Sequence, residues 1–172
     1  MATPTQKQQP WLVSGPALEL LHAPVAATQT WGIGSPVYLN QGALTLCVNS
    51  DAAEDKAIVG YAATAIAAPT TGTEVYYYRI CEPAKQFFGV YVSASGTDAA
   101  APTTLIGDDF GHRIEASSPF AGYMTLDTDL TSHVSMRVED VMRNRDTKID
   151  NSATPGVAVV RFLEPAIVQE GP

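Results

Sequence analysis

Three residues near position 130 have the types and the spacing that could do chemistry. The stretch YMTLDTDLTSH, residues 123 to 133, places Asp127, Asp129 and His133 within seven positions. Two carboxylates close to an imidazole can bind a metal ion, or they can act as a general acid and base. Asp, Thr and Ser also gather where strands turn, because their short side chains hydrogen-bond to the local backbone. Taken alone, this stretch is compatible with an active site and with the end of a strand.

A second acidic cluster, GDDFGH at residues 107 to 112, contains Asp108, Asp109 and His112. Calcium-binding loops need oxygen ligands at alternating positions, a glycine in the middle of the loop and a closing glutamate. Neither acidic cluster has this pattern, and no glycine follows Asp129 within its cluster. We interpret both clusters as turn-forming residues, with a metal site as the alternative. We therefore predict no metal, no cofactor and no catalytic residue.

Other motifs that carry chemistry are missing or incomplete. The sequence has no HExxH zinc motif, no G-x-S-x-G nucleophile elbow and no Walker loop. GIGSPV, residues 32 to 37, begins like a dinucleotide fingerprint but lacks the third glycine, and we interpret it as a turn entering a strand. The run Tyr76, Tyr77 and Tyr78 could stack on bases or sugars. In a strand, however, Tyr76 and Tyr78 share one face, which favours ordinary sheet packing.

The charge of the chain argues against nucleic acid as a partner. The 172 residues carry a formal net charge of −8 and contain no run rich in lysine or arginine that could neutralise a phosphate backbone. One group of bases occurs near the C-terminal end, and acids are interleaved with it. We interpret this group as a solvated surface with salt bridges. Its bases are Arg137, Arg143, Arg145 and Lys148, and its acids are Glu139, Asp140, Asp146 and Asp150.

Targeting and redox signals are equally sparse. The first ten residues lack the apolar core of a signal peptide, and no stretch approaches the roughly 18 to 20 apolar residues that span a bilayer. We expect a soluble product of a cytosol, with no membrane partner. Cys47 and Cys81 are too few for a disulfide scaffold and too isolated for a zinc site. We predict that both are small buried hydrophobic residues.

Short β-prone runs separated by turn signals fill the chain from residue 34 to residue 172. In the segment HVSMRVEDV, Val134, Met136 and Val138 alternate with polar residues, which predicts a strand with one buried face. Many such runs, bounded by segments rich in Gly, Asp, Asn, Ser and Pro, are typical of an antiparallel β-sandwich or barrel. These runs predict a mostly β domain. They are PVYL, LTLCVN, AIVGYAATAIAA, EVYYYRI, FFGVYVSA, FAGYMTL, HVSMRVEDV and GVAVVRFL. IGDDFG, residues 106 to 111, is among the predicted turns.

Residues 1 to 33 have a different composition and are predicted to form an extended N-terminal arm. They contain four prolines, which prevent a long helix, and the short run ALELL could form at most a helical turn. Large apolar side chains on such an arm are costly to leave in water. We predict that the arm takes its order from a neighbouring protomer or another protein, and that the chain cut before residue 31 still folds. The candidate assembly contacts are Trp11, Leu12, Val13 and Trp31.

Two regions resemble the small decoration, or cement, proteins of tailed-bacteriophage capsids. Residues 34 to 67 are similar to the opening of that family, with a strand entered at a glycine turn, a hairpin and an alanine-rich strand. Residues 110 to 163 are similar to its closing half, where a glycine-led aromatic strand reaches an Asp-Thr turn, then a valine-rich strand, a charged loop and a final V-x-V-x-F pattern. The resemblance does not extend to residues 68 to 109 or to the arm.

This resemblance implies a structural role and no catalytic residue. Proteins of this family sit as homotrimers on the outside of the virion, over three-fold or quasi-three-fold positions of the shell. There they stabilise contacts between major capsid protein subunits against the pressure of the packaged DNA. The resemblance also implies that Asp127 and Asp129 form the turn between two strands. We therefore expect a viral capsid protein that is made in the host cytoplasm and located on the capsid exterior.

Two other functions compete with this expectation. One is a carbohydrate-binding or adhesive β module that uses the tyrosines at 76 to 78. The other is a trimeric nucleotide hydrolase resembling the deoxyuridine triphosphatases, whose substrate-binding strand also carries glycine, apolar residues and an aspartate, as in AGYMTLDTD at residues 121 to 129. The arginine- and glycine-rich phosphate loops expected downstream of that strand are missing, so the hydrolase is the weaker alternative.

Overall fold

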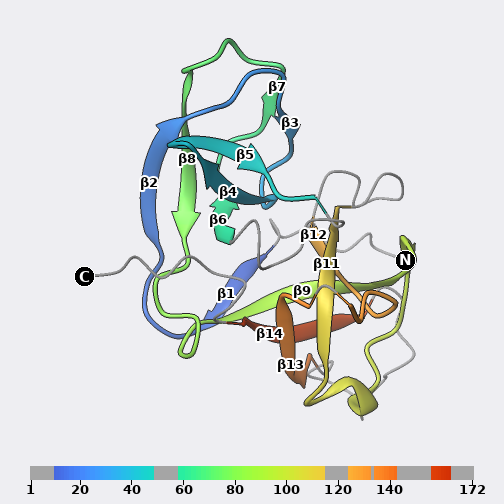
Figure 1. Ribbon diagram of the computed structural model, residues 1–172. Helices are drawn as coiled ribbons and strands as arrows, with labels where there is room; N and C mark the ends of the chain where they lie inside the picture. Colours follow the sequence, from blue (N-terminus) through green and yellow to red (C-terminus); the bar gives the residue numbers. More distant parts are fainter. Residues whose placement is uncertain (1–9, 49–57, 115–123, 133, 143–155, 164–172) are drawn as a thin grey trace, which may run out of the picture.

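The computed structural model describes residues 10–48, 58–114, 124–132, 134–142 and 156–163. Within these ranges the chain is mostly β, and the exception is one short 3-10 turn, η1 (Thr103–Leu105). This confirms the predicted fold class. Figure 1 shows two groups of strands, one built around β8 and the other around β9.

The first group is a five-stranded antiparallel sheet. Its order is β2-β8-β6-β4-β5, and a two-stranded ribbon of β3 and β7 lies in the same part of the sequence. The outer strands β2 and β5 meet at one end, where Ala26 donates a backbone hydrogen bond to the carbonyl of Leu44 at 3.0 Å. These strands are β2 (Glu19–Pro24), β3 (Thr30–Trp31), β4 (Pro36–Asn40), β5 (Ala43–Leu46), β6 (Ile58–Ala62), β7 (Ile66–Ala67) and β8 (Glu74–Arg79).

The second group contains a closed barrel of five strands. Its order is β9-β12-β11-β13-β14, and β14 pairs with β9 to close the ring. The β9–β12 pair is parallel and the other four pairs are antiparallel. Two further strands, β1 (Trp11–Ser14) and β10 (Thr97–Asp98), also pair with β9. The barrel strands are β9 (Phe87–Ala94), β11 (Asp109–Ile114), β12 (Met124–Asp127), β13 (Met136–Val141) and β14 (Val157–Phe162).

Two hydrophobic cores form because successive residues of a strand point to opposite faces. The first core fills the barrel, and the second lies inside the five-stranded sheet around Val37, Leu44 and Tyr77. The alternation predicted for HVSMRVEDV is confirmed, since Met136 and Val138 are fully buried. Residues of the five-stranded sheet also reach the first core, so one face of that sheet packs on the barrel. They are Cys47, Ile58, Tyr61 and Ile80.

The three consecutive tyrosines of β8 lie in different environments. Tyr77 is buried in the second core, and Tyr78 packs against the first core from the opposite face. Ordinary sheet packing, as predicted, therefore accounts for these two. Tyr76 shares the face of Tyr78 but is 52% exposed. Its ring contacts the exposed His22 ring, with the centroids 6.0 Å apart.

The prediction for the two cysteines is half right. Cys47 is buried in the first core, whereas Cys81 is exposed. The reason is position, because Cys81 follows β8 in the connection to β9 and has no sheet face to cover it. The side chain of Gln86 in the same connection is fully buried, and its amide donates to the carbonyl of Pro16 at 3.2 Å.

The predicted arm differs most from the structure. Its described part forms β1, β2 and β3, which pair with β9, β8 and β7 of the same chain. Prolines do not prevent this, because Pro16 lies between strands and Pro24 ends β2, an edge strand of the sheet order. The run ALELL contributes to β2 and is not a helical turn. The pairing therefore places the boundary between the two groups of strands in the connection from β8 to β9, and not at residue 34. The exception is β1, which precedes β2 in the sequence but pairs with β9 of the barrel.

We expect removal of residues 1–30 to destabilise the whole domain, contrary to the prediction from sequence. The truncation deletes β2, which pairs along six residues with β8, and it removes the buried Val25 from the second core. The melting temperature measured by circular dichroism should fall by more than ~10 °C. Removal of residues 1–9 alone is the control. An unchanged melting temperature after the longer truncation would show that β1 and β2 are dispensable.

Candidate functional site

The first acidic cluster lies where three barrel strands meet. Asp127 is the last residue of β12, and its backbone is paired with Gly111 of β11 on one side and with Ser93 of β9 on the other. Its side chain is fully buried. A buried carboxylate is costly unless it is paired and hydrogen-bonded, so its partners explain why it is tolerated.

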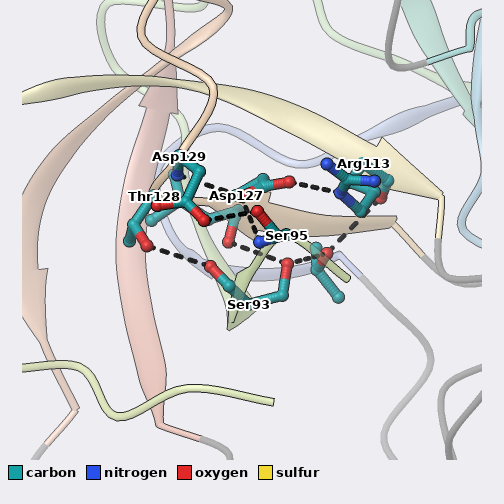
Figure 2. A network of polar contacts seen from close by, with 8 residues as sticks. Ser93, Ser95, Arg113, Asp127, Thr128 and Asp129 are labelled. Carbon is teal, nitrogen blue, oxygen red and sulfur yellow. Dashed lines mark hydrogen bonds and ion pairs between the residues drawn. The ribbon is translucent and has the colours of Figure 1, made fainter. Parts of the chain in front are cut away.

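The carboxylate of Asp127 has partners for both oxygens (Figure 2). Oδ2 accepts a hydrogen bond from Nε of Arg113, a cation on the neighbouring strand β11. Oδ1 accepts from the backbone N–H of Ser95 at 3.1 Å and from the backbone N–H of Asp129 at 3.0 Å. The bond to Asp129 is the local turn interaction predicted from the sequence. The other two bonds join β12 to β11 and to the end of β9.

Asp129 completes the connection to the turn that follows β9. Its Oδ2 accepts from the hydroxyl of Ser95 at 2.6 Å. Ser95 and Gly96 are the two residues between β9 and β10, and both have positive φ angles of 50° and 79°. Positive φ at both central residues is what a tight type I′ hairpin turn requires. The two aspartates therefore hold this strained turn against the end of β12.

Hydroxyl groups extend the network along the parallel β9–β12 pair. Thr128 donates to the carbonyl of Ser93 through its backbone N–H, at 3.0 Å, and through its hydroxyl, at 3.2 Å. The buried hydroxyls of Ser93 and Thr125 lie 2.9 Å apart. A parallel pair cannot be joined by a tight hairpin, so these polar contacts fix the register of two strands that are distant in sequence.

The second acidic cluster does not form a site. Asp109 makes a two-point ion pair with Arg137 of β13, with Arg Nε to Asp Oδ1 at 2.7 Å and Arg Nη2 to Asp Oδ2 at 2.8 Å. This pair raises the pKa of Arg137 above its usual value through the hydrogen bond and the carboxylate charge. Asp108 is exposed, and His112 is buried on the other side of the strand. The prediction that IGDDFG is a turn was wrong for residues 109 to 111, which begin β11.

His112 connects the barrel to the five-stranded sheet. One ring nitrogen, Nδ1, lies 3.0 Å from the hydroxyl of Ser135, and the other, Nε2, lies 3.3 Å from the carbonyl oxygen of Cys47. A carbonyl can only accept, so Nε2 carries a proton and donates to it; in the neutral imidazole, Nδ1 then accepts from the serine hydroxyl. His133 lies outside the described residues. The ring nitrogens of His112 lie within hydrogen-bond distance of the Ser135 hydroxyl and the Cys47 carbonyl.

The mixed charges near the C-terminal end are partly described. Arg137 pairs with Asp109, as above, and Glu139 pairs with Arg161 across β13 and β14. These pairs fit the predicted surface with salt bridges. Residues 143 to 150 lie outside the described part of the chain. GIGSPV forms the predicted turn, in which Ser35 N–H donates to the carbonyl of Gly32 at 3.3 Å.

The candidate assembly contacts are largely used within the chain. Trp31 is buried in the second core, and its Nε1 donates to the carbonyl of Thr64 at 3.0 Å. Leu12 packs against the first core, and Trp11 contacts the edge of the Tyr91 ring. Among the four candidates, Val13 alone is exposed, at 41%. The prediction that the other three wait for a neighbour is corrected, because β1 and β3 are already paired.

Comparison with known proteins gives no assignment: no protein-family model, curated protein or solved structure matches this chain. Among the described residues, no three His, Cys, Asp or Glu side chains are grouped as metal ligands. The same part of the chain contains no helix with the length and apolar character needed to cross a membrane. The hydrogen bonds of Asp127 and its neighbours hold β9, β11 and β12 together.

We expect no stoichiometric binding of Ca²⁺ or Zn²⁺ at the Asp127 turn. The oxygens of Asp127 already accept three hydrogen bonds, one of them from the cation of Arg113. Calorimetric titration of the parent protein and of a variant with Asp127→Asn and Asp129→Asn should give no saturable heat that the double substitution removes. Such a heat, lost in the variant, would reassign the turn as a metal site.

Sequence reasoning did not identify Arg113 and Ser95 as partners of Asp127. Arg113 is 14 positions earlier and Ser95 is 32 positions earlier, so only the strand register brings them together. One signal was present in the sequence. Asp127 follows Thr125 on the face of the strand MTLD that is opposite to the apolar Met124 and Leu126, and an acid that is buried there requires a cationic or backbone partner on the adjacent strand.

Proposed function

We propose that this chain is a structural protein of a tailed-phage virion. In this proposal it binds the outside of the capsid as a homotrimer and stabilises contacts between major capsid protein subunits. The resemblance of residues 34 to 67 and 110 to 163 to capsid decoration proteins supports it. Those two segments correspond to β4–β7 and to β11–β14, so each belongs to one of the two groups of strands.

The observation that carries the proposal is the structural role of the acidic turn that contains Asp127 and Asp129. Asp127 and Asp129 are the strongest candidates for chemistry in the sequence, and their carboxylates hold strands and a hairpin turn together. The side chain of Asp127 is fully buried and paired with Arg113, so it offers no surface to a substrate. This supports a scaffold whose polar groups serve stability, and it weakens the nucleotide hydrolase alternative.

Two measurements test the proposal. Light scattering at micromolar concentration should give the mass of a trimer, about three times 18.2 kDa. The protein should also co-sediment with undecorated phage capsids and co-purify with DNA-filled particles. A monomer that fails to sediment with capsids would overturn the proposal. A trimer that does not bind capsids would support the predicted oligomeric state but exclude the capsid as the partner.

One observation favours a carbohydrate-binding or adhesive module as the second candidate. Leu20 and Tyr76, each 52% exposed, lie with His22 on the same outward face of β2 and β8. Exposed aromatic rings are the usual platforms for sugar rings. A glycan array tests this candidate, with Tyr76→Ala as the matched variant. Glycan binding that the substitution removes would favour the adhesive function over capsid attachment.

A further inference from the structure

A small cavity lies where β1 meets both groups of strands. It has a volume of about 240 Å³ and is partly open to solvent. This is less than the ~300 Å³ at which pockets for whole small molecules begin, so the cavity suits one part of a larger ligand. Its described lining carries no charged side chain. That lining consists chiefly of aromatic and other apolar residues, which are Trp11, Tyr61, Tyr78, Pro10, Leu18 and Ile33.

The aromatic part of the lining is held in place by its neighbours. Trp11 is paired with Gly89 of β9, and a side chain at Gly89 would collide with the indole, so the ring lies directly on that strand. Tyr61 and Tyr78 are paired across β6 and β8, with their ring centroids 5.4 Å apart. The ring of Phe88 packs edge-to-face against Tyr61, with the centroids 5.9 Å apart. The cavity is therefore formed before any ligand binds.

Two tyrosine hydroxyl groups reach the cavity. Tyr61 is 4% exposed and Tyr78 is partly buried, yet within the described part of the chain neither hydroxyl forms a hydrogen bond. Both hydroxyl oxygens are still accessible to solvent. Burial, together with the neighbouring Tyr78, raises the pKa of the Tyr61 hydroxyl, which therefore stays protonated and able to donate. Largely buried polar groups without a partner are costly, so these two hydroxyls indicate a ligand that brings hydrogen-bond acceptors.

An extended segment that contains prolines matches these features. A prolyl ring is apolar and uncharged, and the carbonyl groups of the segment can accept hydrogen bonds from the tyrosine hydroxyls. Proline has no N–H group, so it leaves no donor unpaired against the walls formed by Leu18 and Ile33. A sugar would place several hydroxyl groups against the same walls, where they have no partner. Proline-rich segments are also ordered before they bind, and they dock in grooves lined by aromatic rings.

We propose that the cavity is a binding site for an extended, proline-containing segment of another protein, with a prolyl ring against the indole of Trp11. The hydroxyl groups of Tyr61 and Tyr78 donate hydrogen bonds to carbonyl groups of that segment. This binding does not require the proposed capsid function, because the cavity is formed within one chain.

Calorimetric titration of the full-length protein with a blocked peptide of ten prolines tests the proposal. Saturable binding is expected, and a glycine-serine peptide of the same length should give none. Tyr78→Phe removes one hydroxyl and keeps the ring, so it should weaken binding about fivefold. Tyr76→Phe is the matched control, because it changes an exposed tyrosine of the same strand outside the cavity, and it should leave the affinity unchanged. Binding should also shift the tryptophan emission to shorter wavelength, because Trp11 lines the cavity and Trp31 is already buried.

Three results would overturn the proposal. No saturable heat with the proline peptide, or an equal affinity for the glycine-serine peptide, would show that the protein does not recognise prolyl rings. An unchanged affinity of Tyr78→Phe, or an equal loss for Tyr76→Phe, would place the peptide outside the cavity. A shift of the emission when the parent is diluted without peptide would identify a second copy as the occupant. Circular dichroism identifies any misfolded variant, and Tyr61→Phe then supplies the same test from β6.

Discussion

The Asp127→Asn variant is expected to lose about 2 to 4 kcal/mol of unfolding free energy. The substitution keeps the size of a fully buried side chain but removes its charge. An amide has one oxygen, which can still accept from the backbone N–H groups of Ser95 and Asp129. Its NH₂ group then faces Nε of Arg113, so two donors meet and the cation has no partner there. Urea denaturation followed by circular dichroism measures this loss.

Asp109→Asn is the matched control for this effect. Its partner Arg137 is 40% exposed and Asp109 is 29% exposed, whereas Arg113 is 25% exposed and Asp127 is fully buried. Solvated ion pairs contribute at most about 1 kcal/mol, so the control should lose less than that. Equal losses for the two variants would mean that burial does not distinguish the two ion pairs.

Gly60→Ala is expected to destabilise the protein by about 3 kcal/mol or more. Gly60 lies in the middle of β6, and a Cβ atom there would approach the carbonyl oxygen of Tyr78 to within less than 3.0 Å. The obstacle is backbone of the adjacent strand β8, which cannot move without breaking the pairing between the two strands. Thermal melting and urea denaturation should both show the loss.

Gly42→Ala separates this steric effect from the general cost of replacing a glycine. Gly42 lies in the hairpin between β4 and β5, and no atom lies within 4 Å of an added Cβ. Its φ of +83° imposes only the left-handed backbone cost, about 1 kcal/mol. If Gly60→Ala costs no more than this control, β6 and β8 must be able to separate without penalty.

The strands rich in β-branched and aromatic residues could be predicted from the sequence. EVYYYRI, FFGVYVSA and GVAVVRFL correspond to β8, β9 and β14, because such residues make up most of each run. The mostly β fold class followed from these runs. The turn at Asp127 was also predicted, because an aspartate that bonds to the N–H two residues later is a local interaction.

The structural features that were predicted wrongly from the sequence depend on contacts between distant residues. β11 begins within GDDFG, whose two acids and two glycines indicate a turn locally, but Asp109, its first residue, is stabilised there by Arg137 on β13. The described part of the arm contains too few apolar residues to fold alone, and it becomes ordered by pairing with β8 and β9. Arg113 was missed because nothing near it in sequence identifies its partner.

The pairing of β1 with β9 has a consequence for the order of events during synthesis. The strands from β2 to β8 are consecutive in the sequence, so the five-stranded sheet can form before the barrel exists. β1 leaves the ribosome first but must wait for β9, roughly 4 to 15 s later at the usual 5 to 20 residues per second. The barrel itself cannot close until β14 emerges and joins β9. β1 is therefore made before β2 to β8 but ordered after them, and during that interval Trp11 is exposed to chaperones and to neighbouring chains.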